Sequence, residues 1–196
     1  MDRKVFFAFV LGALIVGVPL AVQTYLLSRQ LSDLRNQLNE LRGQINGLLT
    51  NAPTHVEATV DSIRLNLSLD KTSYWLGESV NITLRITNEG NETALLARSS
   101  PPLIKFVIYD ESSQIFSGPQ VTTPVCVEKS LNPEESFSMN LVWNQRAHSN
   151  YTQVEPGIYF IMGRTSPFTT ITVGGQEIEE IETPKIPIEI KPITQS

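Results

Sequence analysis

The sequence has one cysteine and two histidines among its 196 residues. A lone Cys126 forms no internal disulfide and no zinc site built from thiolates. His55 and His148 lie too far apart in the sequence to form a local metal-binding motif. We therefore expect no metal and no cofactor. We also expect Cys126 to be buried as a small hydrophobic side chain, because it lies in the apolar run Val125–Val127.

Sequence motifs of catalysis are missing as well. The chain contains no Gly-x-Ser-x-Gly, no His-Glu-x-x-His and no phosphate-binding glycine loop. The pair Gly174–Gly175 is typical of a hairpin, since no lysine or helical pattern follows it. The acidic cluster Glu177–Glu182 lacks the fixed ligand spacing of a calcium loop. These absences predict a protein that is not an enzyme.

The chain also lacks an excess of positive charge. It carries 15 Lys and Arg against 20 Asp and Glu, a net charge of −5. Proteins that bind nucleic acids normally present a basic patch, so we expect no nucleic-acid partner. The charge is uneven: residues 1–50 hold 5 basic and 3 acidic side chains, whereas residues 51–196 hold 10 and 17. The two parts are different kinds of segment.

An apolar run opens the chain. Residues 1–4 carry charge, and residues 5–22 carry none. Eighteen residues lie at the lower end of what crosses a hydrocarbon core of about 30 Å. A cleaved signal peptide is the alternative. The length and the lack of a small-x-small cleavage site favour an uncleaved anchor. This pattern predicts a single-pass cell-membrane protein, with residues 1–4 in the cytoplasm, a transmembrane helix over 5–22 and the C-terminal domain outside.

A heptad pattern follows over residues 24–49. Apolar side chains recur at alternating spacings of four and three, namely Leu27, Leu31, Leu34, Leu38, Leu41, Ile45 and Leu48. This spacing predicts a coiled-coil stalk. Glutamines at g and arginines at e favour a parallel homo-oligomer. The alternative is a lone amphipathic helix on the membrane or on the domain. Residues 50–62 are expected to be a linker.

From residue 63 the apolar period changes to two. Ile63–Leu69 and Val80–Thr87 alternate apolar and polar side chains, which is typical of half-buried strands. Further strands are expected over Thr93–Ala97, Lys105–Asp110, Gln114–Ser117, Val121–Val127, Ser136–Trp143, Ile158–Arg164 and Phe168–Val173. Short strands separated by turn signals predict an all-β antiparallel sandwich over residues 63–173. Residues 174–196 are acidic and proline-rich, and we expect an edge strand, a solvated tail or a strand offered to a neighbour.

Four Asn-x-Ser/Thr sequons occur, at Asn66, Asn81, Asn91 and Asn150. The first two fall on the polar phase of predicted strands, and the other two fall in predicted loops. All four are candidate N-glycosylation sites, and they favour an exterior domain. The alternative is ordinary surface asparagine in a domain rich in serine and threonine.

Five segments of the globular part carry a family pattern. They are Tyr74–Val80 (Y-x-x-G-E-x-V), Phe106–Asp110 (F-x-V-Y-D), Leu131–Ser136 (L-x-P-G-E-S, with Glu134 where glycine is usual), Trp143–Gln145 (W-D-Q, with Asn144 for the acid) and Val154–Tyr159 (v-x-P-G-x-Y). Over residues 63–165 the chain therefore resembles the BsuPI domain, named for an intracellular proteinase inhibitor. The resemblance implies an immunoglobulin-like β-sandwich.

Taken together, these patterns predict a membrane-anchored surface protein. Its sandwich would bind a protein or an envelope component, and a coiled coil would cluster several copies. Trp75 and Tyr151 are candidate partner anchors. The alternative, implied by the resemblance, is a serine-protease inhibitor that uses a sandwich loop. Residues 98–105 and 144–155 are the candidate loops on length alone.

Overall fold

The computed structural model describes residues 22–41, 43–44, 47, 51–119, 125–148 and 151–193. The chain divides into two compact units, Met1–Leu48 and Leu49–Ser196. The described residues of the first unit include a helix over residues 22–41. The second unit contains all the described strands.

The helix corrects the prediction of a coiled coil. Five of the seven seam residues are described, and all are 58–70% exposed: Leu27, Leu31, Leu34, Leu38 and Leu41. Ile45 and Leu48 lie outside the described residues. The heptad spacing gives one apolar face, but a coiled coil needs a second helix whose side chains enclose that face. The described part of the chain holds one helix and no coiled coil, so the prediction is wrong.

The prediction of a membrane anchor is also corrected. Of the residues that the structure describes, none belongs to a helix both long enough and apolar enough to cross a membrane. The described helix carries charged side chains at short intervals, including Arg29, Asp33 and Arg35. The predicted span over 5–22 and the predicted cytoplasmic residues 1–4 lie outside the described residues, except Val22. The single-pass anchor and the localisation derived from it are therefore not supported.

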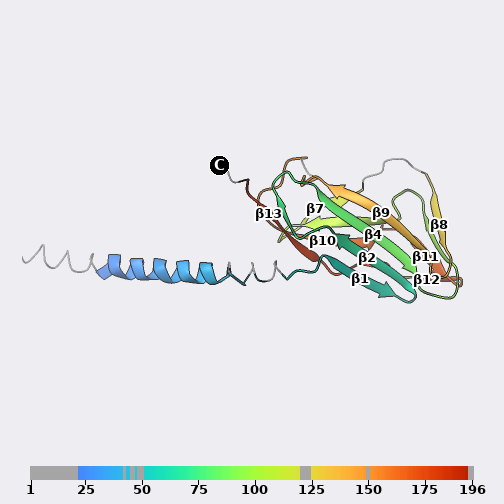
Figure 1. The fold of residues 1–196 in the computed structure, drawn as a ribbon, viewed down its shortest axis with the longest axis horizontal. Coiled ribbons are helices and arrows are strands. Elements are labelled where there is room, and N and C mark those ends of the chain that lie inside the picture. Colours follow the sequence, from blue (N-terminus) through green and yellow to red (C-terminus); the bar gives the residue numbers. More distant parts are fainter. Residues whose placement is uncertain are drawn as a thin grey trace, which may run out of the picture. The chain divides into compact units, whose positions relative to one another are not determined.

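The described strands of the second unit, drawn in Figure 1, form three sheets. The first has the order β1-β2-β4-β9, with β1 His55–Val60, β2 Ile63–Leu69, β4 Val80–Asn88 and β9 Ser136–Trp143. The second has the order β3-β13-β10-β6-β7, with β3 Ser73–Trp75, β13 Ile186–Lys191, β10 Gly157–Thr165, β6 Ile104–Tyr109 and β7 Gln114–Gly118. The third has the order β12-β11-β5-β8, with β12 Gln176–Ile178, β11 Thr170–Val173, β5 Ala94–Arg98 and β8 Val127–Leu131.

This arrangement contradicts the predicted immunoglobulin-like sandwich. The described strands form three sheets instead of two. One pair, β13 with β3, is parallel, whereas the prediction was wholly antiparallel. Alternation along a strand shows which of its faces is buried. It does not show which strand lies beside it, and the assignment of strands to sheets is where the prediction failed.

One hydrophobic core serves all three sheets. Alternate residues of β2 are buried, from Ile63 to Leu69, and β4 buries Val80, Ile82, Leu84 and Ile86 in the same way. The second sheet contributes Phe106 and Ile161 to this cluster, and the third contributes Leu96 and Ile171. Burial of each such side chain contributes about 1.5–3 kcal/mol. The core therefore holds the loops between the strands in place.

The C-terminal segment differs from the expected tail. β13 lies inside the second sheet, between β10 and β3, and it buries Ile186, Ile188 and Ile190. Pro187 is tolerated because β3 pairs only with residues from Glu189 onward. The Glu189 amide points toward β3, because it donates to the Thr72 carbonyl. The nitrogen of Pro187, two residues earlier, points toward the same side of β13. β3 does not extend as far as Pro187, so the proline nitrogen leaves no strand partner without a donor. Likewise, β1 His55–Val60 is a strand of six residues inside the expected linker over residues 50–62.

Gly163 of β10 permits the close approach of the first and second sheets. A Cβ at Gly163 would lie 2.6 Å from Leu84 Cδ2 and 3.4 Å from Leu67 Cβ. Both leucines are fully buried, so neither moves freely. We expect Gly163→Ala to lower the free energy of unfolding by about 1–3 kcal/mol, measured by urea denaturation. Gly157→Ala on the same strand is the matched control. Its Cβ would meet only Tyr159 Cε2 at 4.0 Å, so equal losses for the two variants would contradict the explanation.

Candidate functional site

The structure does not bring the three described sequon asparagines, Asn66, Asn81 and Asn91, together into one site. Asn66 lies on β2, and its Nδ2 donates to His55 Nε2 at 3.0 Å. Asn81 lies on β4, and its Nδ2 donates to Asp70 Oδ2 at 3.1 Å. Asn91 is exposed in the loop between β4 and β5, and Asn150 lies outside the described residues. A glycan on Asn66 or Asn81 would replace one of the two hydrogens of a side-chain nitrogen that already donates a hydrogen bond.

The chemistry-bearing residues do not assemble a metal site. Across the described segments, no group of three His, Cys, Asp or Glu side chains is placed to hold a metal ion. Cys126 is exposed, which corrects the prediction that it is buried. The prediction rested on a strand over 121–127, but β8 begins only at Val127, so Cys126 precedes the strand and faces no core.

Two shallow hollows have linings that include polar side chains already engaged in hydrogen bonds or ion pairs. One, of about 390 Å³, lies on the outer face of the first sheet and includes Arg64 and Arg85. Arg64 pairs with Glu89 at 2.9 Å, and Arg85 donates to Ser136 Oγ at 2.9 Å. The other, of about 300 Å³, includes Asp110. Backbone amides of its own turn lower the pKa of that carboxyl. Neither hollow defines a ligand.

A stronger candidate is the end of the domain where two loops meet through the side chain of Gln145. This residue is fully buried, in the loop that follows β9. Its Nε2 donates to the Trp75 carbonyl at 2.9 Å and to the Glu78 carbonyl at 2.8 Å. Its Oε1 accepts from the Gly77 amide at 2.7 Å and from Gln153 Nε2 at 3.2 Å. All four hydrogen bonds of a buried amide side chain are therefore made.

The loop containing Gln145 also has its own internal support. Trp143 is buried, and its Nε1 donates to the Arg146 carbonyl at 3.0 Å. The Ala147 amide donates to the Thr152 carbonyl at 3.0 Å, and Arg146 Nη1 donates to the Tyr151 carbonyl at 2.8 Å. Gln145 and Tyr151 have φ values of 53° and 54°, which non-glycine residues rarely adopt. The surrounding bonds hold this strained backbone in one conformation.

The partner loop, between β3 and β4, is supported by charged side chains. Glu78 forms an ion pair with Lys71, and its Oε2 accepts from the Trp75 amide at 2.9 Å. The hydrogen bond from Lys71, followed by that from the Trp75 backbone, lowers the pKa of Glu78. Gly77 has φ of 85°, a conformation that glycine adopts without a steric penalty. Tyr74 below the loop is buried, and burial followed by its hydrogen bond to Asp70 raises the pKa of its hydroxyl.

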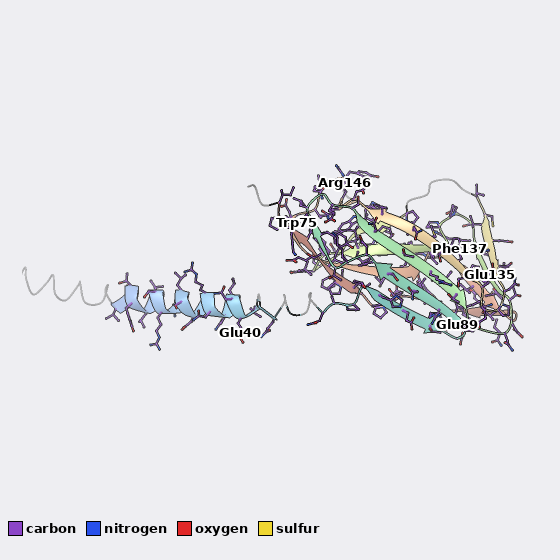
Figure 2. All side chains as sticks on the ribbon, viewed as in Figure 1. Glu40, Trp75, Glu89, Glu135, Phe137 and Arg146 are labelled. Carbon is purple, nitrogen blue, oxygen red and sulfur yellow. The ribbon has the colours of Figure 1, made fainter. Side chains whose placement is uncertain are left out.

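These two loops present large side chains to solvent. Trp75 is 53% exposed and Tyr151 is 64% exposed. Arg146 is exposed between them in the chain, and Figure 2 shows Trp75 and Arg146 at the same end of the domain. Lys191 of β13 lies over the Trp75 ring, with its Nζ 5.8 Å from the ring centroid. We call Trp75, Arg146 and Tyr151 the Trp75–Tyr151 surface.

The two loops proposed from sequence length lie at opposite ends of β10. The loop over 144–155 leads into Gly157, the first residue of β10. The loop over 98–105 lies beside the residue after β10, because the Ser166 amide donates to the Leu103 carbonyl at 2.8 Å. Phe168 stands in that second region, 91% exposed with φ of 65°. It was predicted to begin a strand, but β11 begins at Thr170.

Sequence reasoning named Trp75 and Tyr151 but missed Gln145, because a single polar residue after a strand carries no periodic signal. The available signal was the family pattern. Two of its segments, Tyr74–Val80 and Trp143–Gln145, are far apart in the chain and meet at this site through the hydrogen bonds of Gln145. The pattern thus contains residues that depend on each other in space.

Comparisons with known proteins add no family. No protein-family model matches the chain, and no curated protein sequence matches it. The resemblance to the BsuPI domain therefore stays a prediction. Among solved structures, a β-glucosidase from Listeria innocua in complex with glucose matches 65% of this chain and 16% of its own, at 18% identity and a TM-score of 0.36.

Two further solved structures are similar at the same level. A β-glucosidase from Erythrobacter marinus matches 66% of this chain and 15% of its own, at 14% identity and a TM-score of 0.40. The Pseudomonas fluorescens alkylpurine DNA glycosylase AlkC matches 66% of this chain and 30% of its own, at 13% identity and a TM-score of 0.35. The chain thus spans less than a third of each of these proteins, and we transfer no function from them.

The link through Gln145 is testable with an isosteric substitution. Gln145→Glu keeps an oxygen for the Gly77 amide but cannot donate to both the Trp75 and Glu78 carbonyls. We expect a loss of about 2–4 kcal/mol in the free energy of unfolding at neutral pH, since buried carbonyls and a charge lose their partners. Urea denaturation measures the loss. Gln153→Ala removes one longer bond from the same cluster and should cost less than half as much. Equal losses would show that Gln145 is not the central link.

Proposed function

We propose that the domain over residues 49–196 is a protein-binding module and that the Trp75–Tyr151 surface contacts the partner. The observation that carries the proposal is the pairing of exposed Trp, Tyr and Arg side chains with a fully buried polar link beneath them. Tryptophan, tyrosine and arginine are the residues that most often dominate the free energy of protein–protein binding.

The rigidity of the two loops supports this proposal. Ordering a flexible loop on binding costs about 0.5–1.5 kcal/mol for each immobilised side chain. Here the Trp75 carbonyl is held by Gln145, and the Tyr151 carbonyl is held by Arg146, in the unbound protein. The surface therefore has less ordering left to complete on binding. His148 of the same loop donates its amide to the Ile115 carbonyl and stacks on Phe116, and both contacts help to hold the loop in position.

A set of matched alanine variants tests the proposal. Trp75→Ala and Tyr151→Ala each remove an exposed aromatic ring from the surface, and Phe168→Ala removes one from the opposite end of β10. Proteins captured from the source extract by the wild type and by Phe168→Ala, but not by the other two, identify the partner. With that purified partner, we expect each of the two surface variants to weaken binding at least about tenfold, or about 1.4 kcal/mol, by calorimetry. Retention of the same proteins by all three variants would contradict the proposal.

A second candidate is inhibition of a serine protease by the loop over 144–155. The resemblance to the BsuPI domain suggests it, and the exposed Arg146 on a loop closed by the Arg146–Gln153 bridge favours it. A loop held in one conformation before binding suits an inhibitor. An exposed arginine suits a protease whose specificity pocket is acidic, as in trypsin.

This second candidate predicts a stoichiometric titration. Increasing amounts of the protein should abolish the activity of a trypsin-like or subtilisin-like protease at a molar ratio near one. Arg146→Ala should remove inhibition of the trypsin-like enzyme, whereas Phe168→Ala should not. If neither protease loses activity at a tenfold molar excess, or the protein is simply digested, inhibition is excluded for these classes. The binding proposal is then tested by the alanine variants alone.

A further inference from the structure

The free edges of the three sheets differ in their protection against pairing with another strand. An edge strand is normally shortened, charged, bulged or covered, because its unpaired backbone groups otherwise bind another strand. β3 and β12 have three residues each, β1 carries Glu57, and β8 carries Glu128 and Lys129. The edge of β7 is covered, because the His148 amide donates to the Ile115 carbonyl and its Nε2 lies 2.7 Å from the Ser117 carbonyl.

β9 has none of these protections. It is the longest of the described edge strands, with eight residues, Ser136–Trp143, and its sequence contains no charged residue and no proline. It pairs with β4 over its whole length without a register shift. Its outward side chains, at Ser138, Asn140 and Val142, are exposed.

Hydrogen-bond alternation shows which backbone groups of β9 face the free edge. The Asn88 amide of β4 donates to the Glu135 carbonyl at 3.0 Å, so odd-numbered residues of this strand face β4. Even-numbered residues, from Ser136 to Val142, therefore direct their amide and carbonyl groups away from β4. Among the described residues, no backbone hydrogen bond from outside the strands reaches these groups.

We propose that the free edge of β9 pairs antiparallel with β9 of a second copy of this chain, around a two-fold axis at Asn140. Antiparallel pairing of outward-facing residues allows several registers. In the register centred on Asn140, Ser138 lies opposite Val142 of the other copy, and Asn140 lies opposite Asn140. The Asn140 Oδ1 already accepts from Thr83 Oγ1 at 3.1 Å, which leaves its two Nδ2 hydrogens for the facing amide.

Charge at the two ends of β9 favours a second copy of this chain as the antiparallel partner. Two carboxylates, Glu134 and Glu135, precede the strand, and Arg146 follows it. Figure 2 shows Glu135 and Arg146 at opposite ends of β9. In an antiparallel pair, the acidic start of one strand lies beside the basic end of the other. The uncharged interior avoids like charges facing each other across the axis.

Disulfide trapping in the full chain tests the register. The exposed Cys126 is first replaced, as Cys126→Ser. Asn140→Cys then places two cysteines opposite each other at the axis. Their Cα atoms would be about 5.5 Å apart, which is within the range of a disulfide. Ser138→Cys is the matched control on the same edge. Its two copies would lie about four residues apart along the strands, or roughly 14 Å, beyond that range.

We expect Asn140→Cys to form a disulfide-linked dimer at least tenfold faster than Ser138→Cys under mild oxidation. Equal rates, or no dimer from either variant, would overturn the proposal.

Sedimentation velocity gives an independent measurement on the protein without new cysteines. We expect the wild-type chain to show a concentration-dependent monomer–dimer equilibrium. Asn140→Lys would place two like charges at the axis and should raise the dimer dissociation constant at least tenfold, with an unchanged circular dichroism spectrum. Ser138→Lys would face Val142 and should have a smaller effect.

A wild-type chain that stays monomeric at all concentrations, or equal effects of the two lysines, would refute pairing through this edge. Neither variant alters the Trp75–Tyr151 surface, so this result is separate from the test of binding.

Discussion

The buried side chain of Gln145 is the constraint on which the candidate surface depends. It bonds Trp75 at the end of β3, two residues of the loop between β3 and β4, and one residue of its own loop. A buried amide that loses a partner costs about 1–3 kcal/mol, so neither loop moves without a penalty in stability. The unusual φ angles of Gly77, Gln145 and Tyr151 persist in this setting because the bonds around them leave few alternatives. The buried amide of Gln145 thus links two loops that also have internal hydrogen bonds and an ion pair of their own.

The C-terminal strand, β13, stabilises the Trp75–Tyr151 surface by pairing with β3. β3, which ends at Trp75, has β13 as its only neighbour in the sheet order. β13 in turn pairs with β10, whose first residue follows the loop that carries Tyr151. Segments near residues 75, 157 and 190 thus meet at one end of the domain. Removal of the last strand would leave Trp75 without its sheet, although the two are more than a hundred residues apart in sequence.

The sheet edges at β7 and β9 differ, because a loop residue covers the first and leaves the second open. The edge of β7 is covered by His148, the residue that also positions the loop of Arg146 and Tyr151. The edge of β9 is left open, uncharged and regular over eight residues. Pairing through β9 would use backbone hydrogen bonds, whereas binding through the Trp75–Tyr151 surface would use aromatic side chains. A dimer through β9 would carry two such surfaces and bind a repeated partner more tightly through avidity.

By itself, the sequence determined the parts of the structure that depend on neighbours along the chain. Period-two alternation predicted β2 over Ile63–Leu69 and β9 over Ser136–Trp143 with their observed bounds, because a strand buries every second side chain wherever it is placed. Heptad spacing likewise gave a helix with an apolar face, but whether a second helix covers that face depends on contacts outside the segment.

Only the tertiary structure decided which strands pair, and there the expectation of a two-sheet sandwich failed. β13 is an internal strand, between β10 and β3, because its alternate isoleucines are buried in the hydrophobic core. Cys126 is exposed because β8 starts after it. Gln145 gained its importance from residues about seventy positions earlier. Long-range pairing and the satisfaction of buried polar groups depend on what the folded chain brings close, and no local pattern contains that information.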